Sequence, residues 1–257
     1  MQAILETDKL TKFFGGLEAV SSLDMAVYRG DIVGLIGPNG SGKTTVINMV
    51  SGHIRPTSGR VLFKGQDITA LPPHLITRLG VGRTFQLNVL FNGMTVLQNA
   101  MMGQYVGAQM GDWEDIIPTR LTRKKEVAVQ ERAMGILESL GLSEFKDLDV
   151  RRTPHGVKRL VSIALALGSS PEIVLFDEPL GGMNAEEIDK TIGFLHGLRG
   201  KGTTILIIEH NMRAVMQICD RLVVLNYGAK IAEGSPEEIA EDADVIQAYL
   251  GSKHTIT

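Results

Sequence analysis

A glycine-rich segment with a lysine and a threonine at its end has the residue types and spacing needed to bind polyphosphate. Residues 37–44 read Gly37-Pro38-Asn39-Gly40-Ser41-Gly42-Lys43-Thr44 and fit the pattern G-x-x-x-x-G-K-[ST]. Glycines let successive backbone N–H groups turn toward phosphate oxygens, and the start of a following helix adds partial positive charge. We expect Lys43 to reach the β- and γ-phosphates and the Thr44 hydroxyl to bind Mg²⁺. This phosphate loop alone does not say which phosphate chemistry follows.

Two acidic residues directly after an apolar run carry the chemistry expected beside such a loop. Asp177 and Glu178 follow residues 173–176. Because parallel α/β sheets bind ligands at the carboxyl ends of their strands, we expect the Asp177 carboxylate beside the Mg²⁺ that Thr44 also contacts. Glu178 projects differently and is suited to accept a proton from the water that attacks the γ-phosphate. Acidic residues at strand ends also occur in ordinary turns, but the unbroken apolar strand favours the catalytic interpretation.

Two further polar residues end predicted strands. Gln86 follows residues 80–85, and His210 follows residues 203–209. The Gln86 amide suits contacts to the metal and to the attacking water, and His210 suits a hydrogen bond to the γ-phosphate or to that water. Each alone is more often a solvated residue at a strand end. Together with Glu178 they predict a site that transfers a phosphoryl group to water, mainly by positioning and charge stabilisation.

The elements that must position these residues follow a mixed α/β pattern. Residues 31–36 are typical of a buried parallel strand, and residues 45–50 continue as a helix. Residues 1–33 alternate apolar and polar side chains between glycine turns, which predicts an antiparallel sheet. From residue 87 to about 167 the apolar residues follow a helical period, which indicates a helical insert before the strands return.

The end of the chain is predicted to form a hairpin and one helix. Residues 221–226 and 230–234 are strand-like segments on either side of the turn Tyr227-Gly228. A charged helix is expected from Pro236 onward.

Composition limits the classes of protein to consider. The 257 residues, 44% of them hydrophobic, can bury the core of one large domain or of one domain with an insert. The net charge of −3 includes only a local basic run at residues 120–125, so no nucleic-acid partner is expected. The one cysteine, Cys219, excludes an internal disulfide. Glu6 and Asp8 stand where a secretory signal would be apolar, and no run approaches the roughly 18 apolar residues that span a bilayer.

The order of these features resembles the nucleotide-binding subunit of ABC transporters over essentially the whole chain. The phosphate loop, Gln86, Asp177-Glu178 and Glu209-His210 are similar to that family's Walker A, Q-loop, Walker B and switch histidine, and residues 181–184 are similar to its D-loop. The resemblance implies a fold of the P-loop NTPase (ABC ATPase) class with an N-terminal antiparallel β subdomain and a helical subdomain insert. It implies one nucleotide-binding domain, with an ATP-binding core at 1–86 and 168–257 and a helical subdomain at 87–167.

The resemblance also implies which residues contact each ligand. ATP would be held by a set that includes the base-stacking aromatic, the phosphate loop, the signature glycine and the D-loop: Phe14, Gly37, Pro38, Asn39, Gly40, Ser41, Gly42, Lys43, Thr44, Thr45, Gly156 and Asn184. Mg²⁺ would be held by Thr44, Gln86 and Asp177. Glu178, His210 and Gln86 would be the catalytic residues.

Finer features resemble one branch of the family. The chain is similar to the subunits of branched-chain amino-acid-type importers at residues 14–20, 82–86, 208–212 and 248–251. Some of these importers handle related small polar solutes. The resemblance implies transmembrane permease subunits as partners and, indirectly, a periplasmic solute-binding protein. It places the chain in the cytoplasm, peripheral on the inner face of the cell membrane.

One motif departs from the family pattern. The signature L-S-x-G-x-Q corresponds here to residues 153–158, Thr153-Pro154-His155-Gly156-Val157-Lys158, of which Gly156 alone matches. The family's serine bonds the γ-phosphate held by the opposite subunit, whereas Pro154 offers neither a hydroxyl nor an N–H. Thr153 is expected to cap the following helix and Pro154 to take its first position. The departure is either a weakened half-site or harmless drift.

This departure bears on how the subunit pairs and works. In the family, each of two pockets joins one chain's phosphate loop to the other chain's signature. If the chain paired with itself, both pockets would contain the altered signature. The sequence therefore favours a heterodimer with a second ABC ATPase subunit, with a homodimer as the alternative. The predicted function is ATP hydrolysis that powers an importer; the alternative is an ATP-gated binding subunit with little turnover.

Overall fold

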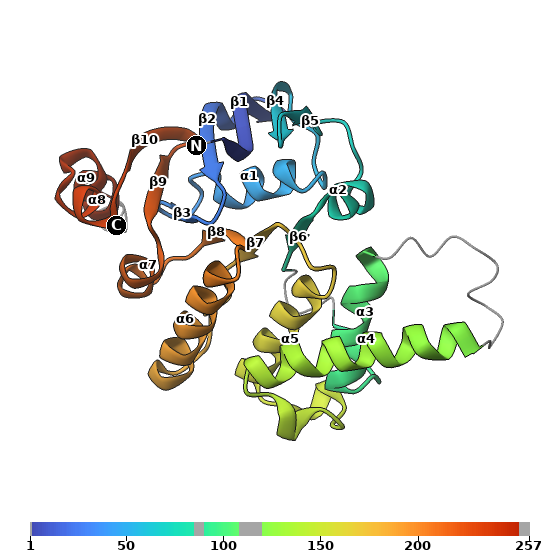
Figure 1. Ribbon diagram of the computed structural model, residues 1–257. Helices are drawn as coiled ribbons and strands as arrows, with labels where there is room; N and C mark the ends of the chain where they lie inside the picture. Colours follow the sequence, from blue (N-terminus) through green and yellow to red (C-terminus); the bar gives the residue numbers. More distant parts are fainter. Residues whose placement is uncertain (1, 85–89, 108–119, 252–257) are drawn as a thin grey trace.

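The computed structural model of the protein describes residues 2–84, 90–107 and 120–251, and Figure 1 shows how they are arranged. A six-stranded sheet at the centre has the strand order β10-β9-β3-β8-β7-β6. β10 runs antiparallel to β9, and the other neighbours are parallel. The strands are β3 (Ile32–Ile36), β6 (Val81–Arg83), β7 (Ile173–Asp177), β8 (Thr204–Ile208), β9 (Arg221–Asn226) and β10 (Ala229–Gly234).

A second, antiparallel sheet lies above the central one in Figure 1 and has the order β2-β1-β4-β5. Its strands are β1 (Ala3–Phe14), β2 (Leu17–Tyr28), β4 (Ser58–Phe63) and β5 (Gln66–Asp67). The predicted N-terminal antiparallel sheet is therefore confirmed. Helix α1 (Lys43–Val50) lies between the two sheets and packs its apolar side chains into a core that they share.

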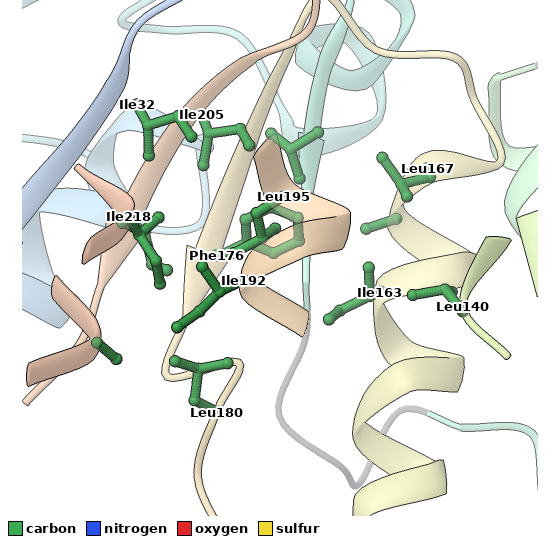
Figure 2. Packing of buried hydrophobic residues seen from close by; sticks show 14 of the residues in the cluster. Ile32, Leu140, Ile163, Leu167, Phe176, Leu180, Ile192, Leu195, Ile205 and Ile218 are labelled. Carbon is green, nitrogen blue, oxygen red and sulfur yellow. The ribbon is translucent and has the colours of Figure 1, made fainter. Parts of the chain in front are cut away.

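The central strands are apolar on both faces because each face borders a separate core. In β7, Ile173 and Leu175 point to the core shared with α1, whereas Val174 and Phe176 point to the opposite core. Side chains alternate along a strand, so such a run must be continuous rather than alternating in polarity. Figure 2 shows the second core, in which Phe176 lies against α6 (Ala185–Gly200).

The remaining helices complete the layers. α7 (Met212–Ile218) packs with α6 below the central sheet in Figure 1, and α2 (Pro73–Leu79) precedes β6. The helical segment between β6 and β7 comprises α3 (Val96–Gly107), α4 (Arg120–Ser139), two short 3₁₀ turns (Ser143–Phe145 and Val150–Arg152) and α5 (His155–Leu167). In the part of the chain that the structure describes, none of the helices combines the length and apolarity that crossing a bilayer requires.

The predicted fold class and the hairpin around Tyr227-Gly228 are confirmed, but the prediction of a single C-terminal helix is wrong. Two helices, α8 (Pro236–Glu241) and α9 (Ala243–Gly251), replace it. Asp242 adopts an extended conformation with ψ of 122°, and its Oδ1 accepts a hydrogen bond from the Val245 N–H. Asp242 therefore ends one helix and caps the next.

Helices α3 and α5 approach closely at a glycine. A methyl group on Gly103 would lie 2.0 Å from the Leu165 carbonyl oxygen, which is backbone and cannot rotate away. Gly135 in α4 has no atom within 4 Å of the same position.

We predict that Gly103→Ala lowers the free energy of unfolding by about 1–3 kcal/mol, because the added methyl forces the two helices apart. The matched control, Gly135→Ala, should raise it by up to about 1 kcal/mol, since alanine favours an exposed helix interior. Urea unfolding of the two variants measures both effects. Equal midpoints for them would contradict the close packing of α3 and α5.

Candidate functional site

The phosphate loop connects β3 to α1 and needs glycine at two positions for steric reasons. Gly37 has φ of 146°, and a side chain there would lie 2.1 Å from the Leu225 carbonyl oxygen. Gly42, the residue before α1, has φ of 103° and would meet the Ala19 carbonyl oxygen at 2.4 Å. Both conformations and both approaches exclude a side chain. The loop leads directly into the N-terminus of α1, as the sequence predicts.

Lys43 lies along this loop rather than in solvent. Its side-chain nitrogen donates to the carbonyl oxygens of Gly37 at 2.8 Å and Pro38 at 2.9 Å. Burial lowers the pKa of Lys43, and the carboxylates of Glu178 and Asp177 oppose that shift. Thr44 is exposed, so its hydroxyl is accessible to a ligand. Lys43 and both carboxylates therefore lie close enough to influence one another electrostatically, and Thr44 is the next residue after Lys43.

Asp177 ends β7 with a side chain that is only 8% exposed. Its backbone N–H donates to the Thr84 hydroxyl at 3.1 Å, and its Oδ2 lies 3.7 Å from an Arg83 nitrogen. Burial raises the pKa of Asp177, and Arg83 is the strongest influence in the opposite direction. Arg83 also donates to the Ser51 hydroxyl at 2.7 Å. No role is predicted for Arg83 from the sequence; the available signal is a charged residue at the end of the short strand β6, three residues before Gln86.

Glu178 and His210 come together from neighbouring strands. The His210 Nδ1 lies 3.7 Å from the Glu178 Oε1, and both side chains are substantially exposed. Glu178 has φ of 50°, in the left-handed region that few residues other than glycine adopt. Its backbone N–H donates to the Ile208 carbonyl at 2.9 Å, which ties the turn after β7 to the end of β8. Such backbone strain persists only where the surrounding contacts fix it, and it is concentrated at functional sites.

The signature segment, residues 153–158, begins α5, but not as predicted. Pro154 is the N-cap with ψ of 158°, and the helix starts at His155 without a side-chain cap. The expected cap by Thr153 is wrong because its hydroxyl donates to the Val150 carbonyl at 2.8 Å instead. Gly156 packs against α6, where a side chain would lie 2.8 Å from the Glu187 Oε1.

The other predicted contacts are placed as follows. Asn184 caps α6 by accepting from the Glu187 N–H at 2.9 Å, while the Glu187 carboxylate accepts from the Asn184 N–H. Phe14 is 47% exposed at the end of β1, and the Lys12 ammonium lies 5.1 Å from its ring centre. Gln86 lies outside the described residues. The structure thus brings Lys43, Asp177, Glu178 and His210 into one group, and Gly156 and Asn184 into another.

Comparisons with known proteins give a consistent result. Residues 20–181 match the family model described as ABC transporter, and residues 229–255 match the one described as branched-chain amino acid ATP-binding cassette transporter. The chain is 40% identical to the high-affinity branched-chain amino acid transport ATP-binding protein LivG of Escherichia coli over 97% of this chain and 98% of that protein. It is also 40% identical to the corresponding protein BraF of Pseudomonas aeruginosa over 96% and 98%.

A solved structure extends this likeness to the fold. The ADP conformation of an ATP-binding cassette of an ABC transporter superposes with a TM-score of 0.84. It shares 33% sequence identity and covers 98% of this chain and 100% of that chain.

We predict that Lys43→Ala weakens binding of a fluorescent ATP analogue to the purified chain by about tenfold to a hundredfold, as expected when a charge-assisted hydrogen bond is lost. Lys190→Ala is the control, since Lys190 is exposed on α6 and pairs with Glu186. Equal affinity of Lys43→Ala and the wild type would show that the loop binds nucleotide without this lysine.

Proposed function

The chain belongs to the ABC transporter family, and we propose that it is the ATP-hydrolysing subunit of an importer for branched-chain amino acids or related small polar solutes. The observation that carries the hydrolytic role is the meeting of Lys43, Asp177, Glu178 and His210 beside the phosphate loop. The choice of solute class is supported by the names of LivG and BraF and by the branched-chain family match at residues 229–255. No comparison favours the alternative of a subunit with little turnover.

The residues present suit ATP and Mg²⁺. Gly37 to Thr45 provide backbone donors and a helix start for polyphosphate, and exposed Phe14 offers a ring face to the base. Thr44, Asp177 and Gln86 would hold the metal, and an all-oxygen ligand set matches the preference of Mg²⁺. When bound, Mg²⁺ supplies neutralisation of charge on the β- and γ-phosphates. Lys43 would exchange its carbonyl partners for phosphate oxygens.

The chain's own groups then divide the reaction between them. Glu178 accepts a proton from the attacking water, for which an exposed carboxylate at the strand end is suited. His210, 3.7 Å from that carboxylate, holds the water or the γ-phosphate in line. Both act by position, so their relative placement decides the rate.

Contact with transmembrane permease subunits is proposed for residues 87–95, part of which is described. Leu90 is 8% exposed and belongs to the second core, so it packs inward. Phe91 is 37% exposed, and its backbone N–H and carbonyl are both held by the Asn99 side chain. A partly exposed aromatic side chain on a backbone held in this way suits a docking surface. Docking on such permease subunits would place this subunit in the cytoplasm, peripheral to the membrane. The periplasmic binding protein would be an indirect partner.

We further propose that a different ABC ATPase subunit is the dimer partner. Pro154 has no side-chain donor, and the segment's role in the family is to complete the pocket of the opposite chain. Pairing with an unlike chain leaves this chain's own phosphate loop opposite a complete signature.

For the catalytic role we predict that Glu178→Gln leaves ATP binding intact and lowers turnover about a hundredfold or more, because the proton acceptor is lost. Phosphate release by the complex assembled with its transport partners measures this. Glu138→Gln, at an exposed position of α4, is the control. Undiminished turnover in Glu178→Gln would remove Glu178 from its assigned role.

For the weakened half-site we predict that Pro154→Ser raises turnover in the pocket that uses residues 153–158, because the serine restores a hydroxyl donor. The substitution is made in the Glu178→Gln background, so that any gain comes from the pocket of the other subunit. No gain in phosphate release would indicate that the altered segment is harmless drift.

A further inference from the structure

A carboxylate next to the switch histidine is almost completely buried. Glu209 follows β8 directly and is 1% exposed, whereas its neighbour His210 is 64% exposed at the side chain. Removing a carboxylate from water is costly unless hydrogen bonds replace its hydration. The position of Glu209 therefore requires specific partners inside the protein.

Glu209 uses each of its two carboxylate oxygens for a different segment of backbone. Its Oε1 accepts from the Leu180 N–H at 2.9 Å. Its Oε2 accepts from the N–H of His210 at 3.1 Å and of Asn211 at 3.4 Å. Leu180 belongs to the turn after β7, and the other two donors open the segment after β8.

These two segments carry the proposed catalytic pair. Leu180 lies two residues after Glu178, and its side chain is 3% exposed in the second core, where Figure 2 shows it near Phe176 and Ile192. The turn is thus held on three sides: the apolar contact of Leu180, the Glu178 N–H bonded to Ile208, and the Leu180 N–H bonded to Glu209. Those contacts hold Glu178 at φ of 50°.

A neutral cap would not serve the same purpose. Asn184 and Ser235 each satisfy an N–H within one helix start at a more exposed position, and a single side-chain oxygen is enough. Glu209 must reach two strand ends at once, which requires two acceptor oxygens on one rigid group. Its burial excludes water as a competing partner and strengthens the bonds.

We propose that Glu209 is a positioning residue that fixes the Glu178 turn and the His210 backbone relative to each other, so that the pair is held ready for the attacking water. This inference rests on the proposed roles of Glu178 and His210. Glu209 contacts no substrate in this account; it acts through the two backbone segments, and its Oε2 also lies 4.0 Å from the His210 Nδ1.

The test is Glu209→Gln in the full complex with its transport partners. The amide keeps the shape but has only one acceptor oxygen, so one of the two segments loses its partner. We expect kcat to fall about tenfold to a hundredfold, as for the loss of a hydrogen bond to a charged group, with KM for ATP near that of the wild type. Amide hydrogen exchange should accelerate in the peptides that contain Leu180 or His210 and stay unchanged in the phosphate loop.

Glu238→Gln is the matched control. Glu238 is also a carboxylate that accepts a backbone N–H, that of Ser235 at 2.7 Å, but it serves the start of α8. It should change stability at most and leave kcat unchanged. If Glu209→Gln fails to fold, Glu209→Asp takes its place, because it keeps the charge and is too short to reach both segments.

The outcomes separate this inference from the proposed function. Wild-type kcat in Glu209→Gln, with Glu178→Gln inactive, would overturn the inference and leave the role of Glu178 standing. A rise in KM with unchanged kcat would likewise overturn it. An active Glu178→Gln complex would overturn both. Finally, Glu209→Gln should lower kcat far less in a His210→Ala complex than in the wild-type complex, because the placement of His210 relative to Glu178 no longer matters once the His210 side chain is gone. Fully independent effects of the two substitutions would contradict the proposal.

Discussion

The shared carboxyl edge of the parallel strands is the constraint on which the site depends. Leu35 of β3 pairs with Ile208 of β8, and Ile208 pairs with Asp177 of β7. The phosphate loop, the acidic pair and the switch segment therefore leave the sheet in one row. A slip by one residue would exchange the side chains of a strand between the two cores, so that residues such as Phe176 would have to pack in the core of the other face. Because each face borders its own core, the cores fix the register, and the register fixes the site.

Buried side chains of opposite charge lie near one another at this edge of the sheet. Burial lowers the pKa of Lys43 and of Arg83 and raises that of Asp177. The opposite charges nearby resist each of these shifts. Arg83 donates a hydrogen bond to the Ser51 hydroxyl just after α1, and its guanidinium lies beside Asp177. A bound cation would therefore meet a carboxylate whose direction is already set.

Sequence reasoning succeeded where the determinants are local. The phosphate loop, the apolar strand before Asp177 and the Tyr227-Gly228 hairpin each follow from neighbouring residue types, and the structure confirms these elements. The predictions from the sequence were wrong where a polar side chain has more than one possible hydrogen-bond partner. Thr153 donates to Val150 rather than capping α5, and Asp242 divides a helix that composition alone would continue. Contacts between residues far apart in the sequence, such as those of Arg83 with Ser51 and Asp177, leave no periodic signal.

In the signature segment, packing is preserved although the side-chain donor is lost. Gly156 is needed because the Glu187 carboxylate occupies the space of a side chain, and that carboxylate also bonds the Asn184 N–H. The starts of α5 and α6 are therefore in contact at Gly156 and Glu187. Pro154 leaves the first N–H groups of α5 as the donors available to an anion. In the proposed pairing this loss falls on the pocket that belongs to the other chain, while Lys43, Asp177, Glu178 and His210 serve this chain's own. An unlike partner that supplies a complete signature is therefore the arrangement in which an intact catalytic group on this chain remains of use.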